Sequence, residues 1–71
     1  MNNYKQGRIF EQAYQEADTQ GIDMSLEDWA QGCGLMRNYG HGYEFESFTK
    51  AEAVKKIEEY AHACIEESAN V

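Results

Sequence analysis

Two helix-start signals and one glycine-bearing turn divide this chain into short elements. Ser25 with Asp28, and Thr49 with Glu52, have the spacing of a capping box, in which a hydroxyl group and an acid satisfy free N–H groups at the start of a helix. Residues 40–42 (Gly-His-Gly) lie between the two boxes and are typical of a tight turn between strands. Because all three signals fall within 71 residues, only short helices and strands fit between them.

Apolar residues at helical spacing predict a helix before, between and after these signals. The N-terminal pattern predicts a helix over residues 3–20, ended by Gly21 in a left-handed conformation. The first capping box should begin a short helix over 26–31, because glycines interrupt the pattern after it. The second box should begin a longer helix with fraying over 68–71. Its apolar face contains Ala53, Val54, Ile57, Ala61, Cys64 and Ile65, with Tyr60 at the edge.

Strand-forming residues lie on both sides of the glycine turn. Residues 35–39 and 43–47 predict two short strands, and the second alternates between Glu44 or Glu46 and less polar side chains. A lone hairpin is only marginally stable in water, so this one should pack against the helices. The order helix-helix-strand-strand-helix predicts an α+β fold with one compact domain over residues 1–71.

The charge of the chain disfavours several classes of partner. Thirteen acids and six bases give a net charge of -7, which disfavours direct binding to nucleic acid or anionic lipid and favours a basic partner. No apolar segment approaches the ~20 residues needed to span a bilayer, so no membrane association is expected. The N-terminal residues lack the apolar core of a signal peptide, which predicts a cytoplasmic protein. The two cysteines are accordingly expected to be reduced.

Patterns for catalysis and for metal binding are weak in this sequence. Cys33, His41, His62 and Cys64 are the residue types that bind zinc, but their spacing does not bring four ligands together. Cys33 and His41 form the one local pair of nucleophile and base, and a chain this short does not readily enclose a deep pocket. We therefore expect no enzymatic activity, no metal and no cofactor.

A helix-turn-helix is one alternative interpretation of the middle of the chain. Residues 25–31 would form its first helix and residues 35–39 would begin a recognition helix. Arg37 and Asn38 on that helix have side chains that can read base edges. The absence of a basic patch in the sequence weighs against this interpretation.

Acidic residues near the C-terminal ends of two predicted helices are the basis of the preferred hypothesis, which is partner binding. In the first and the last helix, bases stand near the N-terminus and acids near the C-terminus, which opposes the helix dipole. Acids in such unfavourable positions indicate that a partner uses them. The candidate partner-binding residues are Glu16, Asp18 and Asp23 in one patch, Glu58, Glu59, Glu66 and Glu67 in another, and Tyr39, His41 and Tyr43 as anchors on the hairpin.

These residues predict a small acidic interaction protein that binds a basic surface of a larger protein. A nucleic-acid-binding protein is one such target. The chain would then act as an inhibitor that mimics nucleic-acid charge, of the kind that phages and mobile elements encode. The alternative is a homodimer formed through the apolar edge of the last helix and Tyr60, with the acids serving solubility alone.

Overall fold

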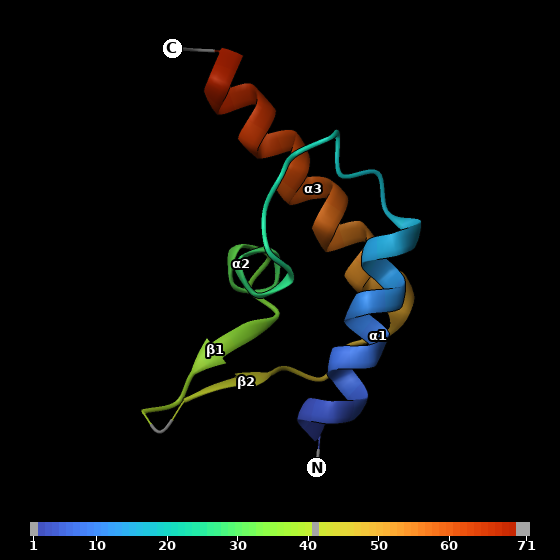
Figure 1. Cartoon of the computed structure of the whole chain (residues 1–71), viewed down its shortest axis with the longest axis vertical. Coiled ribbons are helices and arrows are strands. Elements are labelled where there is room, and N and C mark those ends of the chain that lie inside the picture. Colours follow the sequence, from blue (N-terminus) through green and yellow to red (C-terminus); the bar gives the residue numbers. More distant parts are fainter. Residues whose placement is uncertain (1, 41, 70–71) are drawn as a thin grey trace.

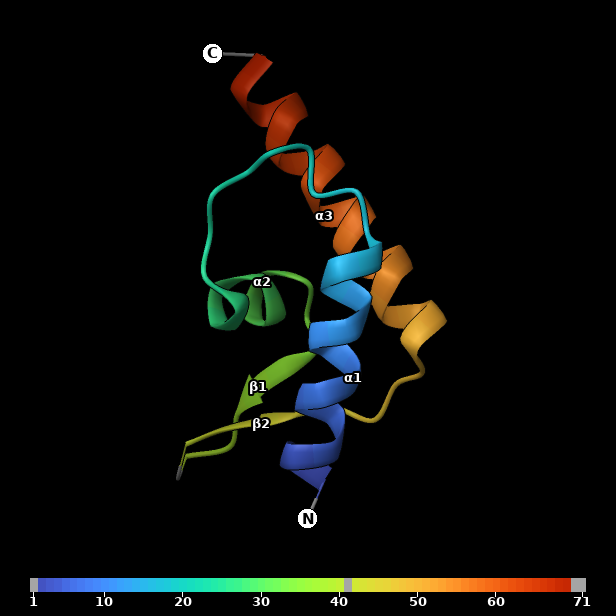
Figure 2. The same ribbon diagram turned by 45° about the vertical axis from the view of Figure 1, so that its right-hand side comes forward.

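Three helices and a two-stranded antiparallel hairpin make up the fold. The structure is a computed structural model and describes residues 2–40 and 42–69. Figures 1 and 2 show α1 and α3 side by side, with α2 and the hairpin on one side of this pair. This arrangement confirms the predicted α+β fold. The elements are, in order, α1 (Asn2–Glu16), α2 (Leu26–Gly32), β1 (Met36–Asn38), β2 (Tyr43–Phe45) and α3 (Lys50–Ala69).

The first helix ends earlier than the predicted position at Gln20. The Asp18 carboxylate accepts hydrogen bonds from the backbone N–H of Gln20 at 3.0 Å and from its side-chain amide at 3.1 Å. A local bond of this kind offers the backbone an alternative to the helix. Gln20 (φ 59°) and Gly21 (φ 74°) then adopt the left-handed conformation, so α1 cannot continue through them.

Both predicted helix starts are confirmed by hydrogen bonds. The Ser25 hydroxyl accepts the Asp28 backbone N–H at 3.2 Å, and α2 begins at the next residue after Ser25. At the start of α3, the Thr49 hydroxyl accepts the Glu52 N–H at 3.2 Å, while the Glu52 carboxylate accepts the Thr49 N–H at 3.0 Å. Hydrogen bonding to Thr49 lowers the pKa of Glu52. The backbone N–H of Thr49 contributes most to this shift, and the side chain of Thr49 contributes less. α3 remains helical through Ala69, and residues 70 and 71 of the predicted frayed end lie outside the described residues.

The hairpin is positioned by its register and by α1. Met36 pairs with Phe45 and Asn38 pairs with Tyr43, and the Leu35 carbonyl accepts the Glu46 N–H at 2.8 Å. The strands are therefore shorter than predicted, although the pairing continues one residue further at this end. Met36 and Phe45 share the face that packs against the core.

Small residues and aromatic rings fill the core. Phe10, Phe45 and Phe48 contact one another with centroid distances of 5.9 to 6.4 Å. Trp29 is 0% exposed, and its ring lies 6.0 Å from Tyr14 and 5.6 Å from Tyr60 in edge-to-face arrangements. The buried residues are Phe10, Ala13, Trp29, Ala30, Leu35, Phe48, Ala53, Ile57 and Ala61.

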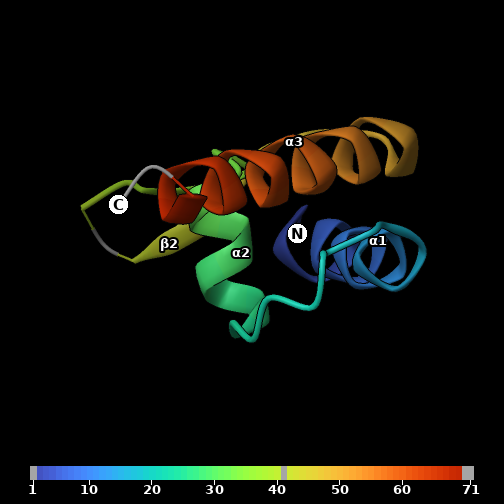
Figure 3. The ribbon, with the colours of Figure 1, turned by 90° about the horizontal axis from the view of Figure 1, so that it is seen from above.

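The C-terminal end of α2 touches α3 through a glycine. A Cβ atom at Gly32 would overlap Cζ and Cε2 of the Tyr60 ring and would lie 2.6 Å from its hydroxyl oxygen. Figure 3 shows this end of α2 directly beside α3. Gly32 therefore leaves room for the Tyr60 ring, and a larger residue at this position would make the ring shift.

We expect Gly32→Ala to destabilise the fold by about 1–3 kcal/mol, because the new methyl group must displace Tyr60 from Trp29. The matched control is Gly7→Ala, where the nearest atom to the new Cβ is Phe45 Cε2 at 3.5 Å. That change should stabilise the helix interior by about 0.5–1 kcal/mol. Urea unfolding followed by the fluorescence of the buried Trp29 measures both values. Equal stabilisation by both alanines would contradict the tight contact.

Candidate functional site

The two acidic patches predicted from the sequence meet on one surface. The backbone N–H of Asp18 donates a hydrogen bond to Oε2 of Glu58 at 3.1 Å, which joins the end of α1 to the middle of α3. Asp18, Gln20, Glu58 and His62 also line one shallow depression of about 200 Å³. Because α1 and α3 pack side by side, acids that lie far apart in the sequence become neighbours.

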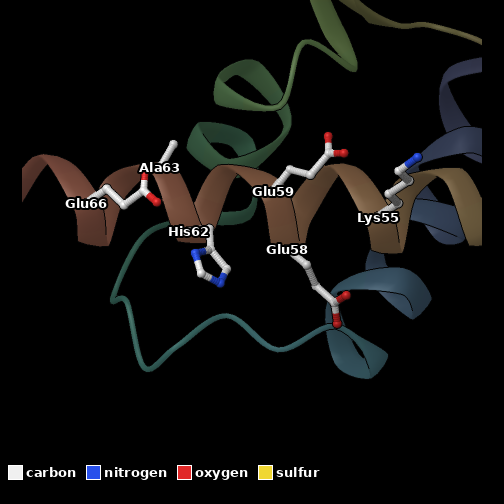
Figure 4. Close-up of a pocket in the computed structure, with 6 residues that line it drawn as sticks. All are labelled: Lys55, Glu58, Glu59, His62, Ala63 and Glu66. Atoms are coloured by element: carbon white, nitrogen blue, oxygen red, sulfur yellow. The ribbon is translucent and has the colours of Figure 1, made fainter.

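A second depression continues this surface along α3. It is open to solvent, has a volume of about 470 Å³ and is lined by Lys55, Glu58, Glu59, His62, Ala63 and Glu66. Figure 4 shows Glu58 and His62 on the side of α3 toward the end of α1, and Glu59 on the other side. We call Asp18, Glu58, Glu59, His62 and Glu66 the acidic face. All five side chains are exposed.

The acidic face keeps its negative charge. Among the side chains that the structure describes, ion pairs join Lys50 Nζ to Glu16 Oε2 at 2.7 Å and Arg37 Nε to Glu46 Oε1 at 2.9 Å. Neither pair involves a residue of the acidic face. Lys55 is the one base that lines the larger depression, so carboxylates outnumber cations on this surface.

Three acids predicted for partner binding lie outside this face. Glu16 is paired with Lys50, which offsets its charge. Asp23 is exposed in the segment between α1 and α2 and lines neither depression. Glu67 acts on Tyr60, because its charge is among those that raise the pKa of the Tyr60 hydroxyl, after burial and Cys64. Residues of both predicted patches thus meet in the acidic face, and partner binding by Glu16, Asp23 and Glu67 stays a prediction.

His62 and Lys55 are members of this surface that the sequence analysis did not select. The missed signal was helical spacing, since Lys55, Glu58, His62 and Glu66 follow one another at intervals of three or four residues. These intervals place them on one side of a helix, away from the apolar stripe. Periodicity of the polar residues would therefore have identified His62 as a neighbour of the acids.

The predicted hairpin anchors are separated from the acidic face and from each other. Tyr39 is 51% exposed, and its hydroxyl donates a hydrogen bond to Glu46 Oε1 at 2.8 Å, which raises the pKa of Tyr39. Tyr43 is 46% exposed and lies on the opposite side of the hairpin, with Asn38, its pairing partner. Figure 1 shows the hairpin far from the C-terminal half of α3. His41 lies outside the described residues.

The helix-turn-helix alternative is wrong about its second helix. Residues 36–38 form β1, because they pair with β2 in a defined register. Arg37 lies on the outer side of this hairpin with its side chain paired to Glu46. Without a recognition helix, Arg37 and Asn38 cannot be presented to a groove in the way that this motif requires.

The homodimer alternative, which uses the apolar edge of the last helix with Tyr60, stays a prediction. Tyr60 is half-buried, with its ring against Gly32 and at 5.6 Å from Trp29. Part of its apolar surface is therefore used within the fold, whereas Ile65 on the same helix is 41% exposed.

The two cysteines are free and half-buried. Burial raises the pKa of the Cys33 thiol from 9.0 to about 11, while the charge of Lys56 opposes this shift and Cys64 adds to it. A thiol with this pKa is almost fully protonated at neutral pH and is a poor nucleophile. Among the described side chains, no group of three His, Cys, Asp or Glu residues is placed to hold a metal ion.

Comparisons of the chain with protein-family models, with curated protein sequences and with solved structures found no significant match. Within the described part of the chain, no helix combines the length and the apolar character needed to cross a membrane. The function is therefore inferred from the geometry and charge of the side chains themselves.

The raised pKa of Cys33 predicts slow alkylation. At about pH 8 the thiolate fraction of folded Cys33 should be about 100-fold lower than in the unfolded chain, and iodoacetamide should react correspondingly slowly. Timed alkylation followed by peptide mass spectrometry, with and without urea, measures this ratio. Lys56→Gln should slow the reaction further, whereas Lys55→Gln should not. Equal rates in the folded and unfolded protein would contradict the burial of the thiol.

The same shift predicts how stability depends on pH. The folded state keeps the Cys33 proton at pH values where the unfolded state has released it. The free energy of unfolding should therefore fall as the pH rises from 9.0 to about 11. Cys33→Ser should show a smaller fall over this range, as measured by urea unfolding at each pH. An identical fall in both proteins would show that other groups cause it.

Proposed function

We propose that this protein acts by binding a basic surface of another protein through the acidic face, without catalysing a reaction. The hydrogen bond from the Asp18 N–H to Glu58 carries this proposal, because it joins acids of two distant segments into one surface. The absence of ion pairs to this face among the described side chains leaves its carboxylates available to a partner.

The shape of the face favours a macromolecular partner over a small molecule. Small-molecule sites are enclosed and bury most of their ligand. The depression along α3 is instead open, and it has carboxylates on both sides and at its end, with Ala63 between them. A helix or loop that bears lysine or arginine side chains fits such a surface. Opposite charges would speed the encounter, and contacts of His62 and Ala63 would add to the lifetime of the complex.

The proposal extends to the class of partner. Grooves that bind nucleic acid are lined with lysine and arginine, so they present the charge that this face complements. Occupation of such a groove would make the protein an inhibitor by charge mimicry, of the kind that phages and mobile elements encode. The two free thiols support a reducing, cytoplasmic setting for this action.

The test compares two variants with the same net charge. Glu58→Gln, Glu59→Gln and Glu66→Gln together neutralise the acidic face, and the amide that replaces the Glu58 carboxylate retains an oxygen that can accept the Asp18 N–H. The control combines Glu11→Gln, Asp23→Asn and Glu67→Gln, which lie elsewhere. Each set raises the net charge from -7 by three units. We expect the first set to weaken binding at least about tenfold and the control to change it little.

The partner is first identified by capture on the immobilised wild-type protein and mass spectrometry, and then purified for measurement of Kd. The wild-type Kd should increase steeply between about 50 mM and about 500 mM salt, and the face variant should lose most of this dependence. Circular dichroism checks that both variants keep the fold. Binding that is lost only in the control variant, or equally in both, would refute a role specific to the acidic face.

A further inference from the structure

The junction of α2 and α3 brings together two cysteines that the proposed function does not use. Cys33 follows Gly32, the residue that lies against the Tyr60 ring, and it forms the C-cap of α2. Cys64 lies one helical turn after Tyr60 on α3. Both cysteines are half-buried, so the contact of Gly32 with Tyr60 holds the two side chains near the same ring.

Two further observations place the thiols at this junction. Cys33 packs against the buried core, and Figure 3 shows the C-terminal end of α2 beside α3. Both cysteines also lie close enough to Tyr60 for the charge of their thiolates to raise the pKa of its hydroxyl. The effect of Cys64 is larger than that of Cys33. A disulfide requires Cα atoms within about 7 Å of each other, so formation of the bond is a direct test of how closely the end of α2 approaches α3 at Cys64.

We propose that Cys33 and Cys64 form an intramolecular disulfide under oxidising conditions, and that this bond fastens α2 to α3. The inference is independent of the proposed function. Oxidised glutathione serves as the oxidant. One protein thiolate attacks the disulfide of oxidised glutathione and releases one glutathione thiolate, which leaves a mixed disulfide between the protein and glutathione. The second cysteine then attacks the protein sulfur and releases the second glutathione. The two protein protons pass to the two glutathione thiolates, so the protein is oxidised by two electrons and glutathione is reduced.

The order of attack follows from the environment of Cys33. Cys33 is almost fully protonated near neutral pH, because burial raises its pKa to about 11. Cys64 is therefore expected to attack the oxidant first, and Cys33 to complete the bond once the mixed disulfide lies next to it. Proximity makes this second step intramolecular, which compensates for the low thiolate fraction of Cys33.

The disulfide would stabilise α2, the shortest of the three helices. α2 has 7 residues, too few for a stable isolated helix, and it is held by the buried side chains of Trp29 and Ala30 and by the contact of Gly32 with Tyr60. A link from Cys33 to Cys64 would close a loop that contains the whole hairpin. Closure of a loop of this length restricts the unfolded chain, and Tm should rise by on the order of 10 °C.

The experiment treats the purified full chain with an excess of oxidised glutathione at about pH 8 and follows its intact mass. The expected product is a monomer about 2 Da lighter than the reduced protein, with peptides of Cys33 and Cys64 linked on a non-reducing map. Its Tm should be higher and should return to the starting value with dithiothreitol. Accumulation of two glutathione adducts, a disulfide-linked dimer, or a lower Tm of the linked monomer would overturn the proposal.

Single-cysteine variants separate the two steps. Cys33→Ser should stop at one glutathione adduct on Cys64, and Cys64→Ser should form its adduct on Cys33 much more slowly. Equal rates in the two variants would overturn the proposed order of attack. The mass and the Tm of the wild-type protein decide whether the bond forms, so the outcome does not depend on either variant folding.

Discussion

The packing of α1 against α3 is the contact on which the rest of this structure depends. Fully buried alanines at positions 13, 53 and 61 allow the two helices to approach closely, because they place no bulky side chain between the backbones. Polar contacts then join α1 and the residues just after it to the residue before α3 and to the middle of α3. The Gln6 side chain accepts the Phe48 N–H at 3.2 Å, and Glu58 accepts the Asp18 N–H at 3.1 Å. The hairpin gains a surface to pack on, and the acids of two segments become one face.

Aromatic packing supplies much of the stability that a chain of this size cannot obtain from a large core. A domain this small buries only a limited share of its surface, so each buried ring is important for its stability. Trp29 links all three helices because its ring contacts Tyr14 of α1 and Tyr60 of α3. Its Nε1 is buried without a hydrogen-bond partner among the described residues, so shape and ring packing hold it in place. Gly32 fits this arrangement, since the Tyr60 ring that packs on Trp29 also lies against the end of α2.

The sequence predicted the parts of the fold that local chemistry decides. The caps at Ser25 and Thr49 and the glycine turn lie where they were expected, because a few adjacent residues determine each of them. The end of α1 was misplaced, because Asp18 bonds both to Gln20 within its own turn and to Glu58 across the fold. The acidic face was predicted only in fragments for the same reason. Spacing along α3 could identify its acids, but only the packing of α1 on α3 adds Asp18.

Repulsion between the carboxylates of the acidic face disfavours the folded free protein, and this repulsion bears on how the face would bind a partner. Glu58 and Glu59 lie in the middle of α3 and Glu66 in its last turn, so like charges line one helix and the helix dipole disfavours the charge of Glu66. The Asp18 N–H offsets part of the repulsion at Glu58, but no described ion pair neutralises the face. In the proposed complex, lysine and arginine side chains of the partner would relieve the same repulsion. Charge that weakens the isolated fold would then strengthen the complex, because binding removes the repulsion that the free protein retains.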